Sequence, residues 1–232
     1  MSLFSTFDTS GIVAISDCSH GTMKLGSADA THNRDRFFNS IGIAPSSVVS
    51  AELVHGNIVE VVTGRHAGQT VVGADGLLTN EPGIFLSITT ADCLPIFLFS
   101  GANNMLGILH AGRQGISLGI IRSAILLAGE KFSVSPESIS VGIGPGICQK
   151  HYEVKDDVLE PFTNYHDAVL RDGNKIFLDL KKIAKIQCIE HGILEKNIVV
   201  STVCTYEDKH YFSQRRDRHD PVEAMVSVIG RK

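Results

Sequence analysis

The fold is organised around the stretch Thr89-Thr90-Ala91-Asp92-Cys93-Leu94-Pro95. The apolar segment Ile96-Phe97-Leu98-Phe99 follows it directly. Polar residues give way here to a short buried strand, and Pro95 restricts the backbone at the junction. Asp92 and Cys93 therefore stand side by side where a loop meets a strand. Because a thiol is a nucleophile and a metal ligand, this junction is the first candidate for a functional site.

Two other segments bring histidines to similar positions. A buried strand is predicted at 105–109 and ends at His110, and a strand at 47–54 delivers His55. Zinc favours thiolate and imidazole ligands, and a catalytic zinc keeps three protein ligands and one open position. His55, Cys93 and His110 are therefore candidate zinc ligands. The alternative for each one alone is structural: a hydrogen-bonded histidine at a strand end, or a cysteine that packs in the core.

The composition describes a chain that can bury one sizeable core. It has 232 residues, of which 43% are hydrophobic, and a formal net charge of −4 with no basic block. Nucleic acid and anionic membranes are therefore not expected partners. No apolar run reaches the roughly 20 residues of a membrane helix, and residues 1–10 lack the features of a signal peptide. Five dispersed cysteines without a C-x-x-C pair are typical of a reducing compartment, so a cytoplasmic protein is expected.

The order of the predicted elements indicates an α/β (α+β) fold with mixed sheets in a single domain over 1–232. The regions 64–73 and Asp75-Gly76 are predicted to be a loop and a turn. Strands and helices interleave without strict alternation, which favours mixed sheets over a purely parallel one. Strands are predicted at 11–15, 47–54, 58–62, 84–89, 105–109, 139–143, 198–200 and 225–229, and helices from 33, at 114–131, at 156–162 and at 178–191.

Several short motifs occur together and in order, and their combination resembles the laccase-domain or polyphenol-oxidase-like family. That family is understood as zinc-dependent purine nucleoside phosphorylases with adenosine deaminase activity. The similarity extends from Asn33-Arg34 to Ile229. The motifs are Val54-His55-Gly56, Ala74-Asp75-Gly76-Leu77-Leu78-Thr79, Thr90-Ala91-Asp92-Cys93-Leu94-Pro95-Ile96, Leu109-His110-Ala111-Gly112, Gly144-Pro145-Gly146-Ile147, Tyr152-Glu153-Val154, Cys204-Thr205 and Phe212-Ser213-Gln214-Arg215-Arg216-Asp217.

The resemblance implies an α/β/β/α arrangement of mixed sheets and one zinc ion bound by His55, Cys93 and His110. It also implies adenosine, inosine or methylthioadenosine as nucleoside substrate, phosphate as co-substrate, and Arg34 as a substrate-contacting and catalytic group. Arg215 is a candidate anchor for phosphate. Asp92 is a candidate proton-transfer or metal-supporting group, although capping of its own loop is at least as good an interpretation.

Three positions depart from the family pattern. Arg113-Gln114-Gly115 follows His110-Ala111-Gly112 where Trp-Arg-Gly is usual. If the usual arginine helps bind an anion, either Arg113 serves from a neighbouring position or that contact is lost. Cys148 stands where a glycine is usual, and 220–223 replaces a Thr-Gly-Arg segment. These changes leave the three predicted zinc ligands in place and bear on substrate choice and turnover.

Three other functions use the same residues. A metal-free cysteine hydrolase would employ Cys93 as nucleophile, His110 as base and Asp92 or an asparagine as the orienting group. A binding module could keep the fold and the metal without turnover. A multicopper laccase would need many paired histidines, and none of the ten histidines forms a His-x-His pair, so this chemistry is not expected.

Overall fold

A computed structural model of the chain describes residues 11–101 and 103–232. The segment 1–10, in which no signal peptide is predicted, lies outside the described residues. Within them, no helix is both long and apolar enough to cross a membrane.

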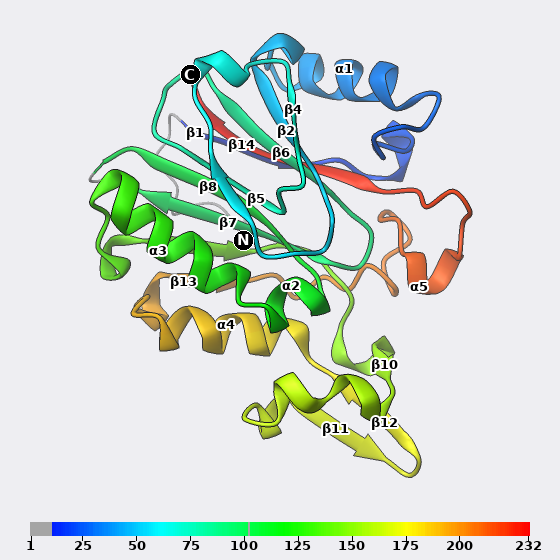
Figure 1. Ribbon diagram of the computed structural model, residues 1–232. Coiled ribbons are helices and arrows are strands. Elements are labelled where there is room, and N and C mark those ends of the chain that lie inside the picture. Colours follow the sequence, from blue (N-terminus) through cyan, green and yellow to red (C-terminus); the bar gives the residue numbers. More distant parts are fainter. Residues whose placement is uncertain (1–10, 102) are drawn as a thin grey trace.

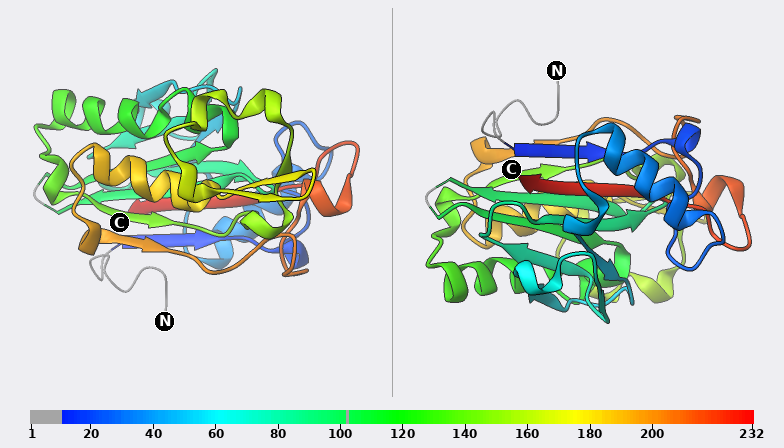
Figure 2. Two further views of the ribbon diagram at one scale, coloured as in Figure 1. Left: turned by 90° about the horizontal axis from the view of Figure 1, so that it is seen from below. Right: turned by 90° about the horizontal axis from the view of Figure 1, so that it is seen from above.

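Two large sheets lie face to face, and each contains parallel and antiparallel neighbours (Figures 1 and 2). The first has the order β1-β14-β6-β2-β4 and consists of β1 (Gly11–Ile15), β14 (Met225–Arg231), β6 (Phe85–Thr90), β2 (Val48–Glu52) and β4 (Thr70–Val72). The second has the order β13-β9-β7-β8-β5-β3 and consists of β13 (Ile198–Val200), β9 (Ser140–Ile143), β7 (Leu94–Ser100), β8 (Met105–Ala111), β5 (Gly76–Thr79) and β3 (Val59–Val61).

Helices cover the two outer faces of this pair of sheets. α1 (Ala30–Ser40) lies outside the first sheet, whereas α3 (Ile120–Phe132) and α4 (Leu180–Glu190) lie outside the second (Figure 1). The short helices α2 (Arg113–Ser117) and α5 (Gln214–Asp217) lie at the ends of the sheets. The predicted mixed sheets flanked by helices in α/β/β/α layers are therefore confirmed.

The layers follow from the alternation of apolar side chains along the central strands. In β7, Phe97 belongs to the apolar cluster between the sheets, whereas Ile96 and Leu98 belong to the cluster beneath α3 and α4. A third cluster contains Phe37 and Phe38 of α1 with residues of the first sheet. Because β7 and β8 are buried on both faces, their sequences read as almost continuous apolar runs.

Some predicted elements differ from the observed ones for local reasons. The predicted helix 114–131 is two helices, α2 and α3, because Gly119 adopts a left-handed conformation with φ 81°. The predicted loop 64–73 contains β4, and the predicted helix 156–162 is two 3₁₀ turns. A small sheet with the order β10-β12-β11 was not predicted; it consists of β10 (Glu153–Val154), β12 (Lys175–Leu178) and β11 (Val169–Asp172) and projects beyond α4 (Figure 1).

Gly107 tests the close packing of β8, the strand that carries His110. A Cβ atom at this position would overlap Leu78 Cδ2 and lie 3.3 Å from Leu98 Cβ. The substitution Gly107→Ala should therefore lower the free energy of unfolding by about 1–3 kcal/mol, the usual cost of overpacking a tight core. Urea unfolding measures this change. Gly101→Ala is the matched control, since its Cβ would meet only the Phe99 ring at 3.7 Å; equal losses in both variants would contradict the packing argument.

Candidate functional site

The loop after β2 carries His55 in a strained backbone conformation. His55 has a φ of 61°, which is unusual for a residue with a side chain. The carboxylate of Asp75 holds this loop by accepting hydrogen bonds from three successive backbone N–H groups: Val54 at 3.2 Å, His55 at 2.9 Å and Gly56 at 2.7 Å. A fully buried carboxylate needs such partners, and they determine the position of the His55 side chain.

Asp75 also orients the second histidine. Its Oδ1 lies 2.9 Å from Nδ1 of His110, and the His110 backbone N–H donates to the Asp75 carbonyl oxygen at 2.7 Å. The Asp75 carboxylate accepts a hydrogen bond from the Nδ1–H group, so the other ring nitrogen, Nε2, is left to act as a ligand or base. Asp75 was predicted to be a turn residue, and the structure corrects this: it is fully buried immediately before β5.

Cys93 completes a cluster with these two histidines. It lies between β6 and β7, and one ligating atom each from His55, Cys93 and His110 lie within 4.8 Å of one another. The two imidazole rings meet edge to face, with centroids 4.8 Å apart and an interplanar angle of 85°. The last position of the His110-Ala111-Gly112 motif requires glycine, because a Cβ atom at Gly112 would lie 2.7 Å from Cys93 Sγ.

The electrostatics of the cluster favour an anionic sulfur. Burial would raise the pKa of Cys93, but the positive charge of His110 and hydrogen bonds with both histidines lower it to about 6. Burial would lower the pKa of His110, whereas the Cys93 thiolate and the Asp75 carboxylate raise it to about 9. For Asp75, burial is again opposed by its hydrogen bonds with His110 and with the backbone, and its pKa is lowered. Without metal, the two groups therefore favour each other's charged form: a thiolate on Cys93 and an imidazolium on His110.

The donor set fits a zinc ion. One thiolate and two imidazoles are ligands that zinc prefers, and three protein ligands leave a fourth position open. The carboxylate of Asp75 behind His110 is the support that metal-bound histidines commonly have. The structure thus brings together the three side chains predicted as ligands and adds Asp75, which the sequence analysis did not assign to the site.

Asp92 connects the Cys93 loop to two distant segments. It adopts a φ of 83°, and its two carboxylate oxygens accept hydrogen bonds from the Thr205 hydroxyl and the Arg215 backbone N–H, each at 2.7 Å. Its carbonyl oxygen accepts from the Ile147 N–H at 3.0 Å. These contacts match the loop-capping interpretation, and they also place the backbone of Arg215 relative to Cys93.

Two predicted substrate residues, Arg113 and Arg215, lie beside Tyr152, and Tyr152 in turn lies near Cys93. The guanidinium carbon of Arg215 lies 5.1 Å from the centre of the Tyr152 ring, and Arg113 is close enough to Tyr152 to act on the pKa of its hydroxyl. Burial and the negative charge of Cys93 raise the pKa of Tyr152, while the two arginines act in the opposite direction. Tyr152 belongs to a quoted motif but was given no role. Only the fold reveals that it stands between two arginines and near Cys93.

Arg34 lies in a different place. It is buried on α1, where its guanidinium donates to the hydroxyls of Ser50 at 2.6 Å and Ser87 at 3.0 Å and stacks on Phe38. Burial lowers the pKa of Arg34 to about 10, so it stays charged at neutral pH. These partners belong to the face of the first sheet that α1 covers, not to the His–Cys–His cluster, and a substrate contact of Arg34 stays a prediction.

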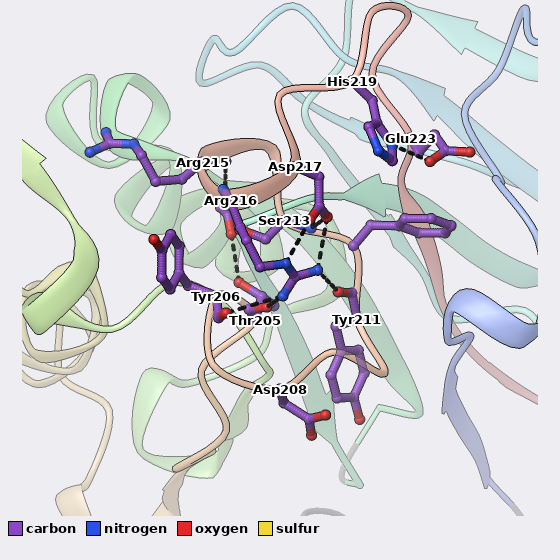
Figure 3. A network of polar contacts seen from close by, with 12 residues as sticks. Thr205, Tyr206, Asp208, Tyr211, Ser213, Arg215, Arg216, Asp217, His219 and Glu223 are labelled. Carbon is purple, nitrogen blue, oxygen red and sulfur yellow. Dashed lines mark hydrogen bonds and ion pairs between the residues drawn. The ribbon is translucent and has the colours of Figure 1, made fainter.

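Arg216, which follows Arg215 in the chain, has a structural role. Its guanidinium pairs with Asp217 and donates to the carbonyl oxygens of Thr205, Tyr206 and Tyr211 (Figure 3). Figure 3 also shows the Arg215 side chain directed away from this network. Arg216 therefore holds the segment 205–217 in its folded form and leaves Arg215 available to the site.

Comparisons with known proteins identify the family and the fold of the chain. The family model described as multi-copper polyphenol oxidoreductase laccase matches residues 23–232. Purine nucleoside phosphorylase YlmD of Geobacillus stearothermophilus is 32% identical over 218 residues, which cover 88% of this chain and 79% of that protein. Purine nucleoside phosphorylase YfiH of Escherichia coli is 32% identical over 192 residues, or 80% and 75% of the two chains. The crystal structure of YlmD from Geobacillus stearothermophilus has a TM-score of 0.91 at 27% identity, covering 100% of this chain and 94% of that one.

Substitution of Asp75 tests its support of both histidines. Asp75→Asn removes the negative charge that orients His110 and holds the His55 loop, so zinc affinity should fall by roughly 10- to 100-fold. Competition with a chromophoric chelator measures the affinity. Asp29→Asn is the control, since this exposed aspartate makes no side-chain cap bond at α1. Wild-type affinity in Asp75→Asn would remove Asp75 from the site.

The pH dependence of alkylation tests the thiolate. In zinc-free protein, the rate of Cys93 modification by iodoacetamide should rise with pH around a midpoint near 6, because only the thiolate reacts. His110→Gln removes the imidazolium charge and should move this midpoint upward, and added zinc should protect the sulfur. Peptide mapping identifies the modified cysteine. A midpoint near the ordinary thiol value of about 8.5 would exclude the thiolate–imidazolium pair.

Proposed function

The chain belongs to the family described as multi-copper polyphenol oxidoreductase laccase, and we propose that it is a purine nucleoside phosphorylase with a zinc ion bound by His55, Cys93 and His110. The observation that carries the proposal is the convergence of these three ligands in front of the buried Asp75 carboxylate, with two arginines and Tyr152 at the side of Cys93. The names of the relatives at 32% identity support the same reaction.

The proposed reaction breaks the bond between C1′ of the ribose and the purine nitrogen. An oxygen of hydrogen phosphate forms the new bond to C1′, and the proton that the phosphate loses ends on the ring nitrogen of the departing purine, so the products are the free base and ribose 1-phosphate. A bound zinc ion would supply Lewis-acid stabilisation of the charge that develops on the reacting groups. Adenosine and inosine are the first candidate substrates, followed by methylthioadenosine.

The residues around the metal ligands would bind the phosphate and position the groups that contact it. Arg113 and Arg215 provide two positive charges for the phosphate, and the Tyr152 hydroxyl between them can donate a hydrogen bond to it. Arg113 would then bind the anion despite the departure from the family motif. The Asp92 carboxylate accepts a hydrogen bond from the Arg215 backbone N–H, so Asp92 is a positioning residue in this proposal.

Copper oxidase chemistry does not follow from the family's description. Among the residues that the structure describes, two groups of three potential ligands come together, and only one of them contains histidine ligands. A multicopper centre requires several paired histidines, and the sequence has no His-x-His pair.

A cysteine hydrolase is the second candidate, because one observation favours it. Cys93, His110 and Asp75 form the nucleophile, base and orienting carboxylate that such an enzyme needs, with Asp75 in the role considered for Asp92. The two functions compete for the same thiolate: zinc coordination blocks the nucleophile, so the hydrolase requires Cys93 without metal.

Product analysis tests the proposal directly. Zinc-loaded protein incubated with inosine or adenosine should release the free base and ribose 1-phosphate only when phosphate is present. Cys93→Ala should abolish this reaction, whereas Cys188→Ala, at a buried cysteine in α4, should not. Arg113→Ala should raise the KM for phosphate by roughly tenfold or more, since a charge-assisted hydrogen bond is worth about 1.5–3 kcal/mol.

Other products would point to other functions. Ammonia released from adenosine without phosphate would establish the deaminase activity implied by the resemblance. Full turnover after removal of zinc would favour the cysteine hydrolase. Bound zinc with no turnover of any of these nucleosides would contradict the phosphorylase proposal and favour a binding module.

A further inference from the structure

A second group of potential metal ligands lies behind the Cys93 loop. Two short segments, Cys148-Gln149-Lys150-His151 and Cys204-Thr205-Tyr206-Glu207, each place two ligating side chains three positions apart. In the second segment this spacing brings Cys204 and Glu207 together, whereas His151 of the first segment contacts Glu207 and is not part of the ligand cluster. Pairs of ligands separated by two residues are common at zinc sites.

The backbone brings the two segments into register. Gly146 and Cys204 form an isolated parallel β-bridge, and the Thr205 N–H donates to the Gly146 carbonyl oxygen at 3.3 Å. The Cys148 N–H donates to Sγ of Cys204 at 3.2 Å. An N–H donor aimed at a cysteine sulfur stabilises negative charge there, as the outer partners of metal-bound thiolates do.

Three ligating atoms converge at this point. One atom each from Cys148, Cys204 and Glu207 lie within 4.8 Å of one another. The Glu207 carboxylate is held by His151 Nε2 and by Lys150 Nζ, both at 2.9 Å from Oε1. The His151 ring stacks on Tyr206, with centroids 4.2 Å apart and an interplanar angle of 18°. The Glu207 carboxylate, the oxygen ligand of the group, is thus already oriented.

Burial, the Cys204 sulfur and the Glu207 carboxylate raise the pKa of Cys148 to about 12, so a thiolate there needs positive charge beside it. Lys181 is buried and donates to the carbonyl oxygens of Ser201 and Val203, directly before Cys204 in the chain. Its ammonium group and that of Lys150 offset part of the negative charge that two thiolates and one carboxylate would carry. A divalent cation would compensate for most of the rest.

We propose that Cys148, Cys204 and Glu207 bind a second zinc ion, with His151 orienting Glu207. This site is separate from the His55–Cys93–His110 cluster and does not depend on the proposed phosphorylase activity. Two thiolates and a carboxylate are ligands that zinc accepts, and the exposed side of Glu207 gives the ion a path of entry.

The position of this second site gives it a structural role. Ile147 and Thr205, each next to one of its cysteines, are two of the partners that hold Asp92 beside Cys93. An ion that joins Cys148 to Cys204 would therefore fix the supports of the loop that carries the catalytic sulfur. Loss of this ion should loosen the loop without removing any ligand of the first zinc.

Counting metal ions tests the proposal. Protein expressed with zinc, dialysed and analysed by plasma mass spectrometry should hold two zinc ions per chain. Cys148→Ser and Cys204→Ser should each hold one, Cys93→Ala should hold one, and the combination of Cys93→Ala with Cys148→Ser should hold none. Cys188→Ala should keep both ions, which controls for the simple loss of a buried thiol.

Three further measurements address misfolding of the cysteine variants and disulfide formation: zinc affinity of a surface variant, cobalt absorption and a count of free thiols. Glu207→Ala changes an exposed residue, so it should fold and yet bind the second ion at least tenfold more weakly. Cobalt-loaded Cys93→Ala protein should show thiolate-to-cobalt charge-transfer absorption that disappears with Cys148→Ser. A single zinc ion in the wild type that Cys93→Ala removes would overturn the proposal. A count of three free thiols in denatured, unreduced protein would also overturn it, because it would indicate a Cys148–Cys204 disulfide.

Discussion

The site depends on one buried carboxylate that joins the two large sheets. Asp75 precedes β5 in the six-stranded sheet, while the three N–H groups that it accepts from follow β2 in the five-stranded sheet. A buried negative charge without partners would be strongly destabilising, so the His55 loop and the His110 ring must both adapt to it. The positive φ of His55 is the local cost of that adaptation. The histidines therefore converge because both sheets satisfy the same charge.

The path of the chain explains why Cys93 meets them there. β2 and β6 are parallel neighbours, so their carboxyl ends lie side by side along the edge of the first sheet that is formed by strand ends. From that edge the chain crosses directly into β7 of the second sheet, and Cys93 lies in the crossing. β8 is antiparallel to β7 and returns to the same edge with His110. Three strand ends thus deliver one ligand each, and Gly112 leaves space for the sulfur.

The sequence predicted the parts of the fold and of the site that leave a local pattern. Apolar runs identified β6 to β9, and the position of His55, Cys93 and His110 at strand ends identified the cluster that the structure assembles. Asp75 was missed because Asp-Gly is also the common signature of a turn, and only tertiary contacts show that it is buried. The three-residue β4 was missed because it is too short for a periodic pattern. The place of Tyr152 between Arg113 and Arg215 depends on long-range packing, which no local pattern reveals.

The charges of the cluster explain how the same residues could serve a metal or a nucleophile. Without metal, the Asp75 carboxylate and the Cys93 thiolate are opposed by a single positive charge on His110, so the buried group carries one net negative charge. With a divalent ion, His110 becomes a neutral ligand, and the two negative charges are balanced by the ion. Because burial penalises net charge, a divalent cation at the proposed zinc site would relieve the charge of the metal-free cluster.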